Sequence, residues 1–160
     1  MARLSDLKPV YRLFMEAYPF RSIDWRPGAV LSKPLAESRI ALVTSAGFYT
    51  PEQDPFDESI LGGDWSYREI AASTPVASLR SAQTSDAFDR FGIETDPNLA
   101  LPLDRLRELA AARIIGAVAP RHFSIMGSLS APGRLVSRSA PEIASKLRAD
   151  AVDGVLLTPV

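Results

Sequence analysis

The sequence predicts an α/β protein with a three-layer, mostly parallel, doubly wound sheet. Two observations support this fold class. Short apolar segments recur at residues 39–44, 114–119 and 154–160, and amphipathic helical patterns precede the second and third of them. Continuous apolar strands that alternate with helices are typical of parallel sheets covered on both faces. The length of 160 residues has room for one such domain.

Composition excludes several classes of function. The 18 basic residues nearly balance the 19 acidic ones, so no net field favours nucleic acid or an anionic membrane as a partner. The chain has no cysteine and a single histidine, which excludes disulfides, thiolate metal sites and multi-histidine metal centres, and we expect no metal. No apolar run approaches the ~18 residues of a membrane span and no signal-peptide pattern is present, so we expect a cytoplasmic protein.

Residues 1–38 are predicted to form an N-terminal helix and a loop that wraps the domain. Large apolar side chains recur at helical spacing within residues 4–18, at Leu7, Val10, Phe14 and Tyr18. Ser5 or Asp6 can cap this helix. Three prolines and the lack of a clean period indicate a loop over residues 19–38. We therefore divide the chain into an N-terminal region, 1–38, and an α/β domain, 39–160.

The strand predicted at residues 39–44 is followed by Ser45 and Gly47, where α/β folds place their ligands. The Ser45 hydroxyl and the backbone N–H groups beside Gly47 can bind an anionic substrate. An ordinary turn at the end of a strand explains the same two residues, and the sequence alone favours that explanation.

Residues 48–63 form a long, turn-rich segment, and loops of this length in a compact domain are usually functional. The alternation over residues 64–70 then predicts a half-exposed strand, and residues 76–80 predict another short one. On the first, the guanidinium of Arg68 can hold a substrate carboxylate beside Asp64. The alternative is that Arg68 pairs with Asp64 or Glu69 in a structural network.

Two helix-then-strand units complete the chain. Pro102 opens a helix that runs to Arg113 and leads into the strand at 114–119. The Ser139-to-Glu142 spacing fits a capping box, which predicts a helix with Ile143, Leu147 and Ala151 on one face. It leads into a buried-type strand at 154–160. Because nothing follows this strand, we expect a sheet that is incomplete at its C-terminal end.

His122 follows the predicted strand at 114–119, in a loop bounded by Pro120 and Gly127. As the only imidazole, it is the candidate catalytic residue, able to donate a proton or to bind a carboxylate. The alternative is a packing or capping role, which is the commoner fate of a lone histidine.

Seven sequence blocks, taken in order, point to one family. They lie at residues 41–47, 55–57, 63–70, 96–106, 115–119, 122–127 and 151–160. Together they resemble the selenoprotein B family of glycine, sarcosine, betaine and D-proline reductases. The resemblance covers about residues 36–160. It raises the weight of His122 as a functional group, but the histidine that relatives often carry before an aromatic–aspartate pair is missing before Phe88 and Asp89.

In that family, the strand resembling residues 154–160 is followed by a selenocysteine or cysteine redox residue. Selenocysteine is encoded by UGA, which is normally read as a stop. We therefore expect the full-length form to carry selenocysteine directly after Val160, in a reading frame cut at that codon. The chain itself is expected to hold no cofactor.

The resemblance implies reductive cleavage of a C–N bond in a small amino-acid or amine substrate. In the family, the selenolate attacks the α-carbon of a substrate, and a pyruvoyl group in a partner subunit holds some substrates as a Schiff base. Other reductase subunits are thus the expected partners. The alternative is a non-catalytic α/β protein of the same family that binds a small carboxylate or a partner subunit.

Overall fold

The computed structural model describes residue 5 and residues 8–18, 28–83 and 90–160. The chain divides into two compact units, residues 1–30 and 31–160. In the first unit the predicted helix is present as α1 (Pro9–Ala17). It begins after Lys8, which makes no capping bond through its side chain. The domain boundary after residue 38 stays a prediction.

The second unit contains a mixed, mostly parallel sheet built around β1 (Arg39–Thr44). β5 (Ala117–Val118), β6 (Arg121–Ile125) and β7 (Gly154–Thr158) all pair in parallel with β1. β3 (Tyr67–Ala71) pairs antiparallel with β6. Two short strands, β2 (Phe48–Tyr49) and β4 (Arg80–Ser81), form a separate antiparallel pair.

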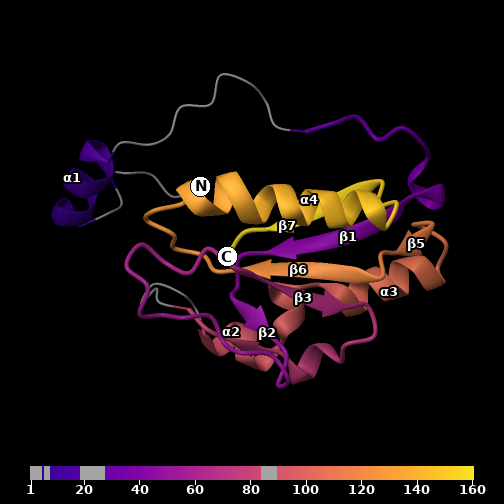
Figure 1. Ribbon diagram of the computed structural model, residues 1–160, viewed down its shortest axis with the longest axis horizontal. Coiled ribbons are helices and arrows are strands. Elements are labelled where there is room, and N and C mark those ends of the chain that lie inside the picture. The colour runs from indigo at the N-terminus through magenta and orange to yellow at the C-terminus, as the bar shows by residue number, and fades with distance from the viewer. Residues whose placement is uncertain (1–4, 6–7, 19–27, 84–89) are drawn as a thin grey trace. The chain divides into compact units, whose positions relative to one another are not determined.

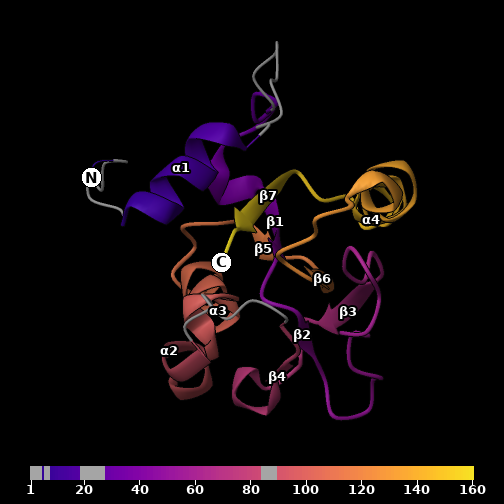
Figure 2. The same cartoon turned by 90° about the vertical axis from the view of Figure 1, so that its left-hand side faces the viewer.

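Helices cover both faces of the sheet. The α-helices are α2 (Arg90–Thr95), α3 (Leu103–Ala111) and α4 (Ala140–Ala149). The shorter turns are η2 (Leu35–Glu37), η3 (Val76–Ser78), η4 (Pro97–Leu99) and the π-helical η5 (Leu135–Ser139). Figures 1 and 2 show α4 on one side of the strands, with α2 and α3 on the other. None of the described helices combines the length and apolar character that a membrane crossing requires.

The alternation of β1 side chains explains the three layers. Ala41 packs in a cluster with Ile143 of α4, whereas Leu42 packs in a second cluster with Leu103 of α3. The side chains of Ala41 and Leu42 are both completely buried. Because successive residues of a strand point to opposite faces, one apolar strand requires helices on both sides. The α/β fold class, with its N-terminal helix, is confirmed.

Two of the predicted strands are wrong in detail. Within the strand predicted at 76–80, residues 76–78 form the 3₁₀ turn η3, and β4 starts only at Arg80. The strand predicted at 114–119 shrinks to β5, because the backbone N–H groups of Ile114 and Ile115 still bond to the carbonyl of Leu109 at the end of α3. Arg113 takes a positive φ of 59° at this helix end.

The predicted capping box at Ser139 is wrong. The helical conformation already starts at Gly133 and continues through η5 into α4, so Ser139 lies inside the helix. Its hydroxyl donates to the carbonyl oxygen of Trp65 (2.5 Å) and makes no cap bond. A long-range partner therefore replaced the local one that the motif predicts. The inner face of α4 is correct at Ile143 and Leu147, which are buried, but Ala151 lies beyond the end of the helix, exposed and with a φ of 52°.

The prediction that the last strand is buried is also wrong. Val155, Leu156 and Leu157 in β7 are 41%, 48% and 67% exposed. β7 pairs with β1 along one edge, and no strand among the described residues pairs with its other edge. A strand at the border of a sheet loses half of its backbone neighbours.

Candidate functional site at the carboxyl edge of the sheet

Ser45 follows β1 directly and bonds to the end of the chain. Its hydroxyl accepts from the backbone N–H of Val160 (3.0 Å) and approaches the carbonyl oxygen of Val160 at 3.3 Å. The Ser45 N–H also donates to the carbonyl of Thr158 (3.3 Å). Ser45 therefore fixes the residues after β7 at the carboxyl edge of the parallel strands, where α/β folds bind ligands.

Gly47 makes a close approach of two backbone segments possible. Its φ is 64°, and a Cβ at this position would lie 2.0 Å from the carbonyl oxygen of Ala82. Its N–H donates to Ile125 (2.9 Å), and its carbonyl accepts from Ala82 (3.0 Å). The N–H that the sequence offered to an anionic substrate is thus used inside the protein, and a substrate role for Gly47 stays a prediction.

His122 lies within β6 rather than in a loop, at an irregular pairing with β1. Ile40 pairs with Val118 and Val43 pairs with Phe123, so two residues of β1 oppose four residues of the neighbouring segment. Since β7 fills the opposite edge of β1 throughout, β5 and β6 form one bulged strand. Pro120, which has no N–H to contribute to a ladder, lies in the bulge.

The His122 ring repairs the hydrogen bond that the bulge removes. The backbone N–H of Leu42 donates to Nδ1 of His122 (3.0 Å). A ring that accepts at Nδ1 is neutral with its proton on Nε2. Burial, and then the charge of Arg107, lower the pKa of His122 to about 4. The side chain is completely buried, so this geometry gives it a structural role in the bulge. A catalytic role stays a prediction.

Two buried polar atoms close to this bond have no partner among the described residues: Nε2 of His122 and Oγ of Ser124. Two residues apart on β6, their side chains face the same side of the sheet. Thr44, opposite Ser124 on β1, pairs in turn with Thr158 on β7. A row of three hydroxyl residues thus crosses the sheet near its carboxyl edge.

Asp64 and Arg68 organise the loop before β3. The carboxylate of Asp64 accepts from the N–H groups of Asp57 (2.9 Å) and Ser66 (2.8 Å). Burial raises the pKa of Asp64, but these bonds and the hydroxyl of Ser66 outweigh it, so that the pKa is lowered overall. Asp64 is 6% exposed, and its carboxylate links Asp57 to Ser66 within the loop.

The guanidinium of Arg68 donates its hydrogen bonds to acceptors in the same loop. It donates to the carbonyls of Asp54 (2.8 Å) and Pro55 (2.9 Å), and to the hydroxyl of Ser66 (2.9 Å). It also lies over the ring of Phe56, 4.3 Å from the ring centre. Neither network partner considered from the sequence forms an ion pair with it, since Glu69 pairs instead with Arg121 and Lys146. Binding of a substrate carboxylate by Arg68 stays a prediction.

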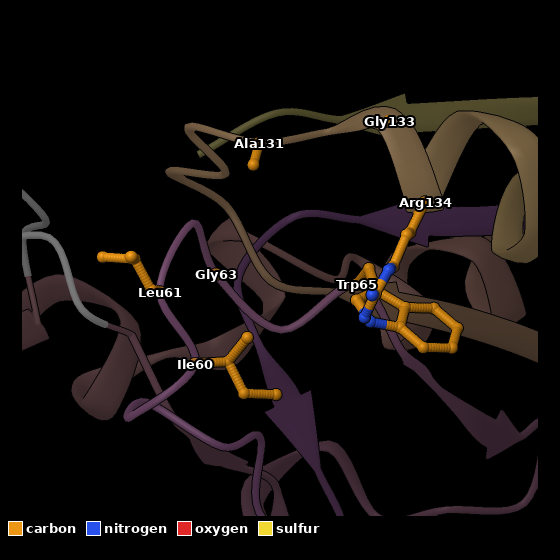
Figure 3. Close-up of a pocket in the computed structure, with 7 residues that line it drawn as sticks. All are labelled: Ile60, Leu61, Gly63, Trp65, Ala131, Gly133 and Arg134. Atoms are coloured by element: carbon orange, nitrogen blue, oxygen red, sulfur yellow. The ribbon is translucent and has the colours of Figure 1, made fainter.

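A hollow near this edge was missed from the sequence. A cavity of about 460 Å³ lies between the loop of residues 60–65 and the segment 131–134. Figure 3 shows Arg134 reaching from its helix toward Trp65. A smaller cavity of about 160 Å³ is lined by Ser45 and the end of β7. Neither cavity is lined by His122, Asp64 or Arg68, so the structure does not bring the predicted residues together.

Comparison with known proteins identifies the family. The family model "Glycine/sarcosine/betaine reductase selenoprotein B" matches residues 10–160. The chain belongs to this family. The selenoprotein B match includes β1, β6, β7 and both helical layers of the α/β unit. Among the described residues, no group of three histidine, cysteine or acidic side chains is placed to hold a metal ion.

Several curated selenoprotein B relatives are similar to the chain. The D-proline reductase subunit gamma of Acetoanaerobium sticklandii is 32% identical, over 97% of this chain and 62% of the relative. The sarcosine reductase complex component B subunit beta of Peptoclostridium acidaminophilum is 26% identical, over 91% and 33%. The glycine reductase complex component B subunit gamma of Carboxydothermus hydrogenoformans is 28% identical, also over 91% and 33%. The chain therefore spans between a third and two thirds of these relatives. No solved structure is detectably similar.

Proposed function

We propose that the chain is the front portion of a selenoprotein B-type reductase component, with a selenocysteine or cysteine directly after Val160. The proposed reaction is reductive cleavage of a C–N bond in a glycine-, sarcosine-, betaine- or D-proline-like substrate. One observation carries the proposal: the family model matches residues 10–160, while the chain spans only 62% and 33% of two relatives. Ser45 holds Val160 at the carboxyl edge of the sheet. A cytoplasmic location is part of the same proposal.

The residues around Val160 fit such a reactive position. Gly127 packs against the end of the chain, since a Cβ on it would lie 3.4 Å from the carbonyl of Val160 and 2.9 Å from that of Ser45. Close packing on this side and the bonds to Ser45 fix the direction in which the next residue would leave the sheet. A selenol placed there would be ionised at neutral pH, unlike a thiol with a pKa near 8.5. A pyruvoyl-bearing partner subunit completes the proposal.

The gene downstream of Val160 tests the proposal. We expect an in-frame UGA codon, a selenocysteine-insertion hairpin in the messenger and a coding continuation with helix and strand patterns. Expression with selenium should then give a selenium-containing product heavier than 17.4 kDa by mass spectrometry. Replacing the UGA by a cysteine codon is the matched control, because it restores the length without selenium. Unrelated or immediately terminated sequence would contradict the proposal.

A second candidate function is partner binding without catalysis, and the exposure of β7 favours it. Three consecutive apolar residues, Val155 to Leu157, face solvent on a strand with an open edge. Such an edge is a template for pairing with another strand. A finished product of 17.4 kDa that co-purifies with a reductase subunit and turns over no substrate would favour this candidate.

A further inference from the structure

The cavity beside Trp65 combines an apolar wall with positive charge. Its lining residues are Ile60, Leu61, Gly63, Trp65, Ala131, Gly133 and Arg134. The two walls are tied together by the bond from the N–H of Ala131 to the carbonyl of Gly62 (3.1 Å). Trp65 is fixed from the helix by the hydroxyl of Ser139, which donates to its carbonyl (2.5 Å). These two hydrogen bonds therefore hold the walls of the cavity in place.

Two guanidinium groups approach Trp65. Arg134 lies 5.8 Å and Arg138 5.7 Å from the centre of the indole ring system. The two residues are four apart in the helical segment, which brings them to the same face. Neither guanidinium forms an ion pair or a hydrogen bond with any residue that the structure describes; each approaches the indole instead. Two cations near one indole, without an acidic partner in the part of the chain that the structure describes, favour a bound anion beside them.

Arg68 and Arg134 differ in how many of their N–H donors are already bonded within the protein. Arg68 donates to three loop acceptors and has little capacity left. Arg134 has the same fork of N–H donors but lines an open cavity with them uncommitted. Since an arginine binds a carboxylate by two parallel hydrogen bonds, the donors must be free before the ligand arrives.

We propose that this cavity is a binding site for a small organic carboxylate. The carboxylate pairs with Arg134, with Arg138 adding charge, and the apolar body of the ligand packs against Ile60, Leu61 and Ala131. No lining side chain is acidic, so the site favours an apolar carboxylate over a zwitterion whose ammonium group would have no partner. This inference does not depend on the reduction proposed above.

Titration of the purified chain with cyclohexanecarboxylate tests the site. The chain has two tryptophans, so a Trp25→Phe background leaves Trp65 as the sole indole reporter. We expect saturable millimolar or tighter binding with a change in Trp65 fluorescence. The uncharged analogue, cyclohexanecarboxamide, and the zwitterion D-proline should each bind at least about tenfold more weakly.

Charge variants assign the binding to the cavity. Arg134→Gln should weaken binding of cyclohexanecarboxylate about tenfold or more, and Arg134→Lys should weaken it less, because charge is kept while the fork is lost. Arg148→Gln is the matched control: this exposed arginine lies on α4, and it lines neither of the two cavities described above. It should leave binding unchanged. Circular dichroism of each variant checks the fold.

Several results would overturn the inference. Equal affinity for the acid and its amide would exclude recognition of charge. Unchanged affinity of folded Arg134→Gln would place the ligand elsewhere. Absence of saturable binding by the wild-type chain at millimolar concentration would exclude the site, and backbone NMR shifts confined to residues outside 60–65 and 131–138 would do the same. Reductase activity or its absence decides none of these outcomes.

Discussion

β6 and β7 both run parallel to β1, one on each side of it, yet the burial of each strand is the reverse of what its composition predicts. β6 carries His122 and Ser124 and is buried along its centre. β7 carries Val155, Leu156 and Leu157, and these are its exposed residues. The more polar strand is thus inside the protein and the more apolar strand is at its border.

The comparison shows that the position of each strand in the sheet, and not its composition, decides how buried it is. β6 lies between β1 and β3, and its Phe123 packs in the cluster under α4. β7 has β1 as its one strand neighbour within the described part of the chain. An apolar border strand is a natural place for a further segment to pack, which is consistent with the continuation or partner proposed above.

The largest expected effect comes from shortening a large side chain on each strand. Phe123→Ala should lower the free energy of unfolding by about 3–5 kcal/mol, because Phe123 is completely buried and its removal leaves a cavity in the cluster under α4. Leu157→Ala should lower it by less than about 1 kcal/mol, since this side chain is 67% exposed. Urea unfolding at neutral pH measures both. Similar losses would show that β7 is covered in solution.

A second difference is a pH dependence that β6 has and β7 lacks. The pKa of His122 is lowered to about 4, whereas an unfolded histidine titrates near 6.5. Between these values the unfolded chain binds a proton that the folded chain does not, so stability falls as the pH falls from about 6.5 to 4, by at most about 3 kcal/mol.

His122→Gln removes this titration and keeps an acceptor for the N–H of Leu42. We expect the variant to lose less stability than the wild type between pH 7.5 and 4.5 in urea unfolding. The carboxylates whose pKa values are lowered, such as Asp64, contribute equally to both proteins and cancel in the comparison. Identical pH slopes would contradict the assignment of a buried neutral imidazole.

The smallest effect compares the hydroxyls of the two strands. The Thr158 hydroxyl on β7 donates to the carbonyl of Ala100 (2.6 Å), so Thr158→Val should cost about 1 kcal/mol of stability while Thr158→Ser costs less. The Ser124 hydroxyl on β6 has no partner among the described residues, and Ser124→Ala should be neutral or stabilising. Thermal unfolding checks the order. A larger loss for Ser124→Ala would reveal a partner for that hydroxyl.

The local sequence pattern predicted an element correctly where its periodicity alone determines which side chains are buried. β1 matches the predicted bounds of 39–44, because an apolar β-branched run is buried on both faces. The inner face of α3 is correct at Leu103 and Leu106. β6 was missed because Pro120 interrupts it and His122 and Ser124 break its apolar character. The missing histidine noted before Phe88 and Asp89 lies outside the described residues.

The candidate site was predictable only in part. The carboxyl end of β1 was expected as a ligand position, and Ser45 does lie there beside Val160. Arg68 was the arginine that the sequence offered for a substrate carboxylate, and Arg134 was not among the candidates. The four-residue spacing of Arg134 and Arg138 is the signal in the sequence that could have indicated a shared helix face. Which arginine is free depends on loop carbonyls that approach Arg68 and not Arg134.

The sequence by itself determined the α/β class, the central strand, the inner faces of two helices and the family, because periodicity and ordered blocks are properties of the chain alone. The tertiary structure decided that His122 bonds to Leu42, that β7 is exposed and that Arg134 is available. Each of these depends on residues far apart in the chain, 80 positions for His122 and Leu42. Only folding brings such partners within hydrogen-bonding distance or leaves a side chain without one.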